Sequence, residues 1–239
     1  MHQQYFLKPI KMFKIITLLF LSFSALSISQ EIGAITDSRD GKVYKIVVIG
    51  TQTWMTRNLD ASNFRNGDPI PEARTNEEWE KAGKEGKPAW CYYENDLANG
   101  AKYGKLYNWY AVKDSRGLAP EGYHVPSDAE WTQIKDYLGG ESDAGGKMKN
   151  TTGWVSPNKD ASNSSGFLGL PGGNRTNWGK FSEIEERGTW WSSTENSQTS
   201  EYAVSDPFAY WFGLHSLVGG TLKNIGNESC GYSIRCVKD

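Results

Sequence analysis

The stretch from Glu121 to Gly140 constrains the fold most, because several local signals in it agree on one helix and on its direction. Ser127 and Glu130 have the spacing of a capping box, in which each side chain satisfies a backbone N–H at the helix start. Gly139 and Gly140 end the helix, since glycine enters the left-handed conformation of a C-cap without steric strain. The sequence therefore predicts a short helix within residues 121–140.

The apolar residues of this helix form one stripe. Trp131, Ile134 and Leu138 recur at i, i+3 and i+7, and charged and amide side chains turn away from them. A single stripe has to be buried against a sheet or a longer helix. We expect these three residues, together with Trp54 from an earlier strand, to be structural residues of the core.

Residues 1–29 have the three parts of a secretory signal peptide. A basic start is followed by an almost charge-free apolar run at residues 15–28, and small residues at alternate positions precede Gln30. The run is shorter than the roughly 20 residues that span a bilayer, and no cysteine follows it to accept a lipid. We therefore expect residues 30–239 to form a single exported domain, secreted or located at the cell surface or in the periplasm, without a membrane span.

The charge of the mature chain argues against a nucleic-acid partner. Removing residues 1–29 removes three lysines, which leaves 23 basic against 28 acidic side chains and a net charge of −5. No cluster of lysine and arginine supplies the electrostatic footprint that phosphate binding requires. Zinc is not expected either, since no CxxC pair occurs and His124 and His215 lie in unrelated contexts.

The first half of the mature chain predicts a hairpin and a second short helix. Residues 43–49 and 53–59 are rich in β-branched and aromatic side chains and are separated by a break that contains glycine. Thr75 and Glu78 repeat the capping-box spacing, and the helix that they start ends near Gly83. We further expect a strand at 90–93 and, at 105–112, either a strand or one buried helical turn, of which we favour the helix.

After residue 140 the chain is rich in Gly, Ser, Asn and Trp, and helix-forming stretches are rare. Brief strands are expected at 147–149, near 154, at 166–170, 189–194, 202–208, 209–214 and 231–237, with turns at 219–220 and 224–227. The loops should be packed, because disordered segments are poor in aromatic residues. The pattern indicates an α+β domain with small antiparallel sheets, two short helices and long packed loops.

Three cysteines, Cys91, Cys230 and Cys236, leave at least one thiol unpaired or intermolecular. On one extended strand Cys230 and Cys236 would lie roughly 20 Å apart, which no disulfide can bridge. A disulfide from Cys91 to Cys236, or to Cys230, is one interpretation. Three buried reduced thiols are the other, because spacing alone does not decide between them.

Ten motifs run in order along almost the whole mature chain: DSRDGKVYKIVVIGTQTWMTRNL, NGDPIPE, CYYEND, YGKLYNWYAV, RGLAPEGYHVPSDAEW, YLGG, AGGKMK, GFLGLPGGNR, WWSSTE and GYSIRCVKD. In this order they resemble the Fibrobacter succinogenes major paralogous domain family, found in secreted proteins of Bacteroidetes and Fibrobacteres. The resemblance implies a C-type-lectin-like fold, distantly similar to formylglycine-generating enzymes through the segments HVPSDAEW and SIRCVKD. It implies no general activity, cofactor or ligand.

The sequence carries no recognisable catalytic constellation. Lectins of the implied fold bind sugar through calcium with Glu-Pro-Asn or Gln-Pro-Asp and Trp-Asn-Asp segments, none of which occurs here, although a structural calcium ion remains compatible with the sequence. Cys236 paired with His124 or His215 is disfavoured as a nucleophile, because a cysteine on a strand is usually a small buried hydrophobe. The copper-binding cysteine pair of formylglycine-generating enzymes is not recognisable, and nothing selects two carboxylates for glycoside hydrolysis.

Tryptophan is the compositional feature that points to a ligand, since the chain has ten of them and sugars stack on exposed indole rings. Trp190 and Trp191 follow one another on an expected strand and must point to opposite faces, so one of them can be exposed. Trp178, near Arg175 in a Gly- and Asn-rich loop, and Trp211 are the further ligand-binding candidates. The alternative is that these aromatic residues fill the core of a domain with few aliphatic side chains.

Two functions from different classes follow from these patterns. The first is a non-catalytic recognition module that binds a glycan or a protein through its aromatic loops, which predicts at least two exposed tryptophans in one groove. The second is a hydrolase or oxidase on the same scaffold, which predicts a pocket with perturbed carboxylates or a Cys–His pair. A structural or adhesive surface domain is a third interpretation.

Overall fold

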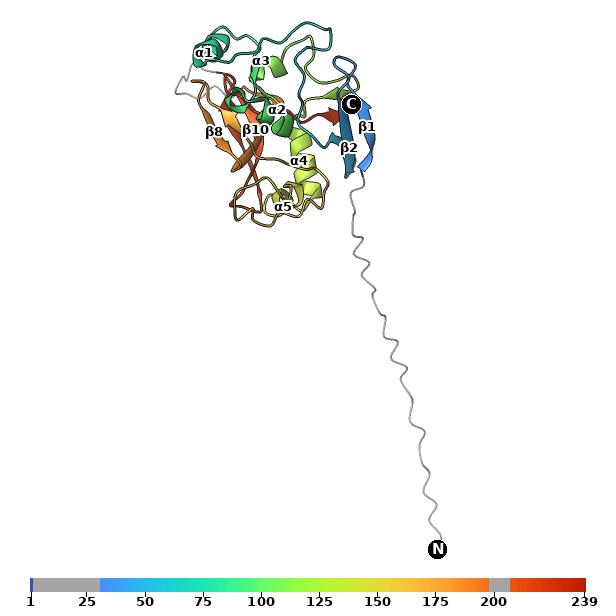
Figure 1. The fold of residues 1–239 in the computed structure, drawn as a ribbon. Helices are drawn as coiled ribbons and strands as arrows, with labels where there is room; N and C mark the ends of the chain where they lie inside the picture. Colours follow the sequence, from blue (N-terminus) through green and yellow to red (C-terminus); the bar gives the residue numbers. More distant parts are fainter. Residues whose placement is uncertain (2–30, 198–206) are drawn as a thin grey trace.

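The computed structural model describes Met1 and residues 31–197 and 207–239. The expected signal peptide, apart from Met1, and most of the expected strand at 202–208 therefore lie outside the described residues. Within them, two five-stranded sheets, a two-stranded sheet and short helices form a mixed α+β structure (Figure 1). None of the helices in these ranges is long and apolar enough to cross a bilayer.

The first sheet brings the two ends of the described chain together. Its order is β1 (Glu31–Thr36), β2 (Val43–Ile49), β3 (Gln52–Met55), β12 (Val237–Lys238) and β6 (Tyr123–His124), with antiparallel neighbours throughout. Figure 1 shows β1, β2 and the C terminus on the same side of the molecule. β12 pairs with β3, and Val47, Ile49 and Val237 share one hydrophobic cluster. The first hairpin and the last strand thus belong to one core.

The second sheet has the order β11 (Thr221–Asn227), β10 (Phe208–His215), β9 (Arg187–Asn196), β7 (Gly172–Arg175) and β8 (Phe181–Ile184). β7 and β9 are parallel, and the other neighbours are antiparallel. The turn predicted at 224–227 is wrong, because these residues continue β11 in register with β10 as far as Asn227. β11 is an edge strand, and its exposed middle residues tolerate the polar sequence that suggested a turn.

The segment between the two sheets holds short helices and a small sheet. β4 (Trp90–Cys91) pairs with β5 (Leu106–Tyr107), and the helices are α1 (Asn76–Lys84), a 3₁₀ turn (Tyr93–Asn95), α2 (Leu97–Tyr103) and α3 (Trp109–Val112). The predicted capping box of Thr75 and Glu78 starts α1. Residues 105–112 contain both of the alternatives considered for them, a two-residue strand followed by one helical turn.

Helix α4 (Asp128–Tyr137) lies between the sheets and starts with the predicted capping box of Ser127 and Glu130. After it, Gly139 and Gly140 have φ values of 107° and 86°. The Trp131, Ile134 and Leu138 stripe is buried in one cluster with residues of both sheets, among them Trp54, Trp190 and Phe212. The stripe therefore joins the two sheets rather than covering one of them.

Helix α5 (Ala144–Met148) replaces the strand that was expected at 147–149. The glycine-rich composition suggested irregular chain here, but Gly145 and Gly146 lie within the helix and have a steric role. A Cβ atom on Gly145 would lie 1.9 Å from the carbonyl oxygen of Gly220, so only glycine lets this helical turn approach the 219–220 backbone. The predicted strand at 166–170 is also absent and is represented by a single bridge between Lys149 and Gly169.

Buried cations hold the long loops together. Lys149 Nζ donates to the carbonyl oxygens of Lys159, His215 and Val218 at 2.6, 3.0 and 2.7 Å. Lys105 contacts Asp60, and Arg235 and Arg175 are likewise enclosed by loop carbonyl groups. Backbone oxygens of loops and strand ends obtain charged donors in this way, which helps to satisfy the requirement that buried polar groups be hydrogen-bonded.

Candidate functional site

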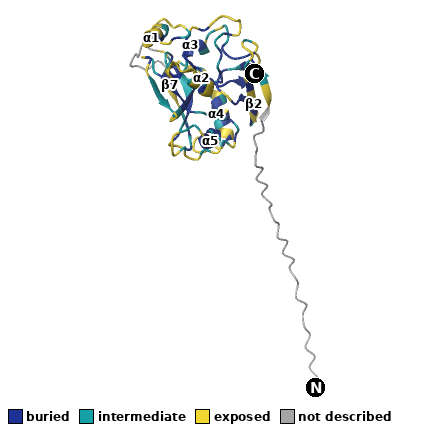
Figure 2. Cartoon of the chain, viewed as in Figure 1, coloured by how far each residue is buried: buried dark blue, intermediate teal, exposed yellow. Residues whose placement is uncertain are grey.

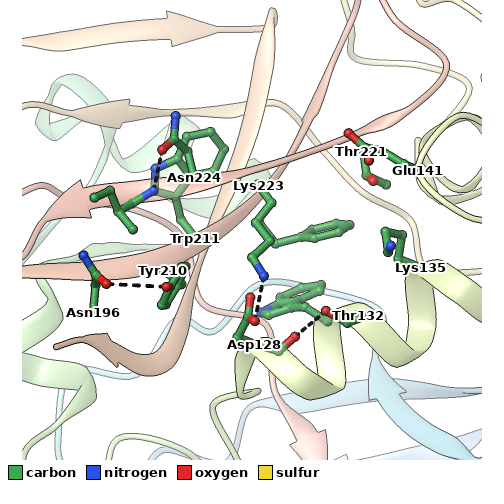
Figure 3. Close-up of a pocket in the computed structure, with 13 residues that line it drawn as sticks. Asp128, Thr132, Lys135, Glu141, Asn196, Tyr210, Trp211, Thr221, Lys223 and Asn224 are labelled. Carbon is green, nitrogen blue, oxygen red and sulfur yellow. Dashed lines mark hydrogen bonds and ion pairs between the residues drawn. The ribbon is translucent and has the colours of Figure 1, made fainter. Parts of the chain in front are cut away.

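A groove of about 540 Å³ lies between the N-terminal half of α4 and strands β10 and β11 (Figure 3). Its size is within the usual range for small-molecule sites. Trp131 and Phe212 form its floor, with ring centroids 4.5 Å apart and planes inclined by 5°. Because both rings are almost fully buried in the core, the floor is rigid before any ligand arrives.

Polar side chains from α4, β9, β10 and β11 form the rim of the groove. Lys223 of β11 makes an ion pair of 2.7 Å with Asp128 at the start of α4, and its ammonium lies 5.2 Å from the centroid of the half-buried Tyr210 ring. The Tyr210 hydroxyl donates to the Asn196 side chain at 3.4 Å. An aromatic face, a carboxylate, an ammonium and an amide are thus gathered at one opening, as Figure 3 shows.

Trp211 lines the same groove, but its indole lies on the opposite face of β10 from Tyr210 and Phe212, as strand alternation requires. The ring packs over Gly213, whose added Cβ would lie 3.0 Å from it, and against Gly226 and Tyr232. Trp211 is half-buried there. It can border a ligand in the groove, but it cannot stack on the ligand beside Tyr210.

Among the described residues, Trp178 is the one exposed tryptophan, with 65% of its surface accessible. It lines a different hollow of about 400 Å³, together with Asn177, Tyr110 and Ser229. Trp178 and Trp211 therefore do not share a cavity, and the expected pair of exposed tryptophans in one groove is not formed.

Three of the ligand-binding candidates are buried, which corrects the expectation that they are accessible. Trp190 and Trp191 point to opposite faces of β9 as predicted, yet both are fully buried because each belongs to a different hydrophobic cluster. Figure 2 shows buried residues concentrated in the interior of the molecule and exposed residues mainly in its outer loops. The Arg175 guanidinium donates to Ala73, Thr75 and Gly179 carbonyl oxygens and lies over the Trp79 ring. These three side chains fill the core and hold loops.

The three cysteines are free, so the disulfide considered for Cys91 and Cys236 is not formed. The physical reason is separation, since Cys91 belongs to the cluster around α1 and Cys236 to the cluster beneath the first sheet. Burial raises the pKa of both thiols to about 12. A thiol that stays protonated at neutral pH is a poor nucleophile, which argues against the Cys236 and histidine pair.

The two histidines of the described chain lie outside the groove. His124 bonds to Glu130 and Asp239, each at 2.7 Å, and His215 accepts a bond from the Leu217 N–H. Within residues 31–197 and 207–239, no three His, Cys, Asp or Glu side chains are grouped closely enough to hold a metal ion.

Sequence reasoning missed Tyr210, Lys223, Asp128 and Asn196 as a group. Each stands in an ordinary polar or aromatic context. The pairing of β10 with β9 and β11 brings Tyr210, Asn196 and Lys223 together, and the packing of α4 on this sheet adds Asp128. Alternation along β10 would have placed Tyr210 and Phe212 on one face. Lys223 could not have been added, because no strand was predicted at 221–223 and residues 224–227 were interpreted as a turn.

The fold and the groove together define a small mixed α+β module with a preformed opening between a helix and a sheet edge. The model of the Fibrobacter succinogenes major domain family matches residues 47–238, and the chain belongs to this family. Searches of curated proteins and of solved structures returned no match.

Proposed function

We propose that the protein is a non-catalytic recognition module that binds a short glycan in the groove between α4 and β10–β11. The observation that carries the proposal is the half-buried Tyr210 ring beside the Lys223–Asp128 ion pair, above a rigid aromatic floor. Sugars present an apolar C–H face that packs on an aromatic ring and hydroxyl groups that pair with carboxylates and amides.

Asp128 and Asn196 supply such polar partners on two sides of Tyr210. Asp128 accepts from Lys223 through one carboxylate oxygen, which leaves the other oxygen able to accept a sugar hydroxyl. Because α4 and the second sheet are joined through Trp131, the two walls are held at a fixed distance. A preformed site loses little ordering entropy on binding.

The proposal includes export of the mature chain and a C-type-lectin-like arrangement. Support for the first is the three-part pattern of residues 1–29. Support for the second is the sheet shared by the first hairpin and the last strand, with a second twisted sheet beside it. The alternative function is that of a hydrolase or oxidase on this scaffold, and the experiment below would detect its reaction product.

The test is a glycan array with the purified protein, with and without calcium, followed by titration of the best ligand. Tyr210→Ala should weaken binding at least tenfold, which corresponds to about 1.4 kcal/mol. Lys223→Gln should also weaken binding, because it frees Asp128 from its fixed position. The matched control is Tyr137→Ala, since Tyr137 is an exposed tyrosine of α4 that does not line the groove.

Equal effects of Tyr210→Ala and Tyr137→Ala would refute the assignment of the groove, as would the absence of any glycan bound by the wild-type protein. Loss of binding in Trp178→Ala alone would move the site to the Trp178 hollow. Release of a hydrolysed or oxidised product from the bound glycan would favour the enzyme alternative.

A further inference from the structure

A second, smaller cavity of about 170 Å³ lies on another part of the molecule, between the start of β2, residues 57–60 and the end of α2. Its charged lining residues are predominantly basic: Lys42, Arg57, Lys102 and Arg235, with Asp60 as the single acidic side chain. This composition contrasts with the net negative charge of the whole chain.

Arg235 is fully buried, and the acceptors around its guanidinium are neutral. Its N–H groups donate to the carbonyl oxygens of Met55 and Phe167 and twice to the Asn58 side-chain oxygen. Four of the five guanidinium donors are used, and the fifth, on Nη2, has no protein partner among the described residues. Burial, with a smaller contribution from the Arg57 charge, lowers the pKa of Arg235 to about 9.

Arg57 adds a second positive charge without an acidic partner. Its guanidinium makes one hydrogen bond, to the Ala101 carbonyl oxygen at 2.9 Å, and no carboxylate of the described residues pairs with it. The other cations of the cavity are compensated, since Lys42 pairs with Asp40 and Asp60, and Lys102 lies 3.6 Å from Glu185. The uncompensated positive charge of the cavity therefore comes from Arg57 and Arg235.

Tyr103 provides an independent sign that a ligand is missing from this cavity. The side chain is 3% exposed and lines the cavity, and its buried hydroxyl has no partner that meets hydrogen-bond geometry, although an interaction with Tyr103 raises the pKa of the neighbouring Lys102. A buried hydroxyl left unpaired is costly, at about 1–3 kcal/mol. Water can satisfy a hydroxyl, but a neutral water does not compensate the buried charge of Arg235.

From these observations we infer that the cavity formed by Arg57, Tyr103 and Arg235 binds a small oxyanion, namely a sulfate, phosphate or carboxylate group. Such a group accepts hydrogen bonds from the Tyr103 hydroxyl and from the free guanidinium donors and supplies the missing negative charge. The cavity is smaller than the roughly 300 Å³ at which sites for whole small molecules begin. It therefore takes a free anion or one acidic substituent of a sugar, and the inference does not depend on the proposed groove.

The first measurement is thermal stability of the purified protein titrated with sodium sulfate, sodium phosphate and sodium glucuronate, against sodium chloride and glucose at matched ionic strength. Saturable stabilisation by at least one oxyanion at millimolar concentration is expected, because a ligand of the native state raises the midpoint. Saturation separates binding from the general, non-saturating effect of sulfate on protein stability. Saturable stabilisation by sulfate or phosphate would identify the ligand as a free anion, and stabilisation by glucuronate alone would identify it as an acidic sugar.

The variants decide whether the effect arises in this cavity. Arg57→Gln should weaken binding of the anion at least tenfold, as measured by calorimetry. Because Arg57 is exposed, this variant should fold normally. Arg74→Gln, which removes an exposed arginine that pairs with Glu72 outside the cavity, is the matched control and should bind as the wild type does.

Tyr103→Phe gives a second signature, because it removes the unpartnered hydroxyl. Without anion the midpoint should stay unchanged or rise, and with anion the stabilisation should be smaller than in the wild type. The inference is overturned if no oxyanion gives saturable stabilisation, or if Arg57→Gln and Arg74→Gln reduce binding equally.

Discussion

Replacement of Trp131 by alanine tests whether one ring joins the two sheets. The Trp131 side chain is 2% exposed, and its ring centroid lies 4.8 Å from that of Trp54 in the first sheet and 4.5 Å from that of Phe212 in the second. Emptying a buried aromatic site costs about 3–5 kcal/mol. The surrounding rings belong to two different sheets that cannot both move inward, so the cavity should persist, and we expect the upper part of that range.

For a domain of about 200 residues each kcal/mol lowers the midpoint by about 2–4 °C, so Trp131→Ala should lower Tm by about 10–20 °C. Urea unfolding followed by tryptophan fluorescence and circular dichroism measures the free energy directly. Trp178→Ala is the matched control, because Trp178 is 65% exposed and its loss should change stability by less than about 0.5 kcal/mol. A loss below about 1 kcal/mol in Trp131→Ala, or equal losses in both variants, would refute this account of the core.

Three further predictions concern the loops, the pH dependence and the C terminus. Lys149→Met removes the ammonium from three part-buried carbonyl oxygens, and one unpaired buried group costs about 1–3 kcal/mol, so urea unfolding should show a loss of at least about 1 kcal/mol; a smaller loss would mean that water replaces the ammonium. Burial opposes the charge of His124, but hydrogen bonds to Asp239 and Glu130 outweigh it and raise the pKa above 6.5. The stabilisation by His124 is therefore complete below pH 6.5 and is lost as the pH rises through the raised pKa. His124→Gln should flatten the decline of Tm over this pH range. A pH profile of Tm that is the same in both proteins would contradict the role given to His124. Deletion of residues 231–239 removes β12 and Arg235 and should abolish cooperative unfolding, whereas a cooperative transition in the shortened chain would show that the last strand is dispensable.

Features that depend on neighbours in sequence were predictable from the residues alone. Both capping boxes and the stripe of α4 follow from side chains three or four positions apart, whose geometry a helix fixes. Alternation along β9 likewise sends Trp190 and Trp191 to opposite faces whatever surrounds the strand. The order of ten motifs also sufficed to indicate the family to which the chain belongs.

The tertiary structure decided which of these local features are exposed, because burial depends on segments far apart in the chain. Trp190 and Trp191 are both buried because two separate clusters cover the second sheet, which no property of residues 189–194 reveals. Gly145 belongs to a helical turn because Gly220, some 75 positions later, lies against it. The groove and the arginine cavity have the same origin, because the packing of sheets, helices and loops places Tyr210 and Asp128 around one opening and Arg235 and Tyr103 around another.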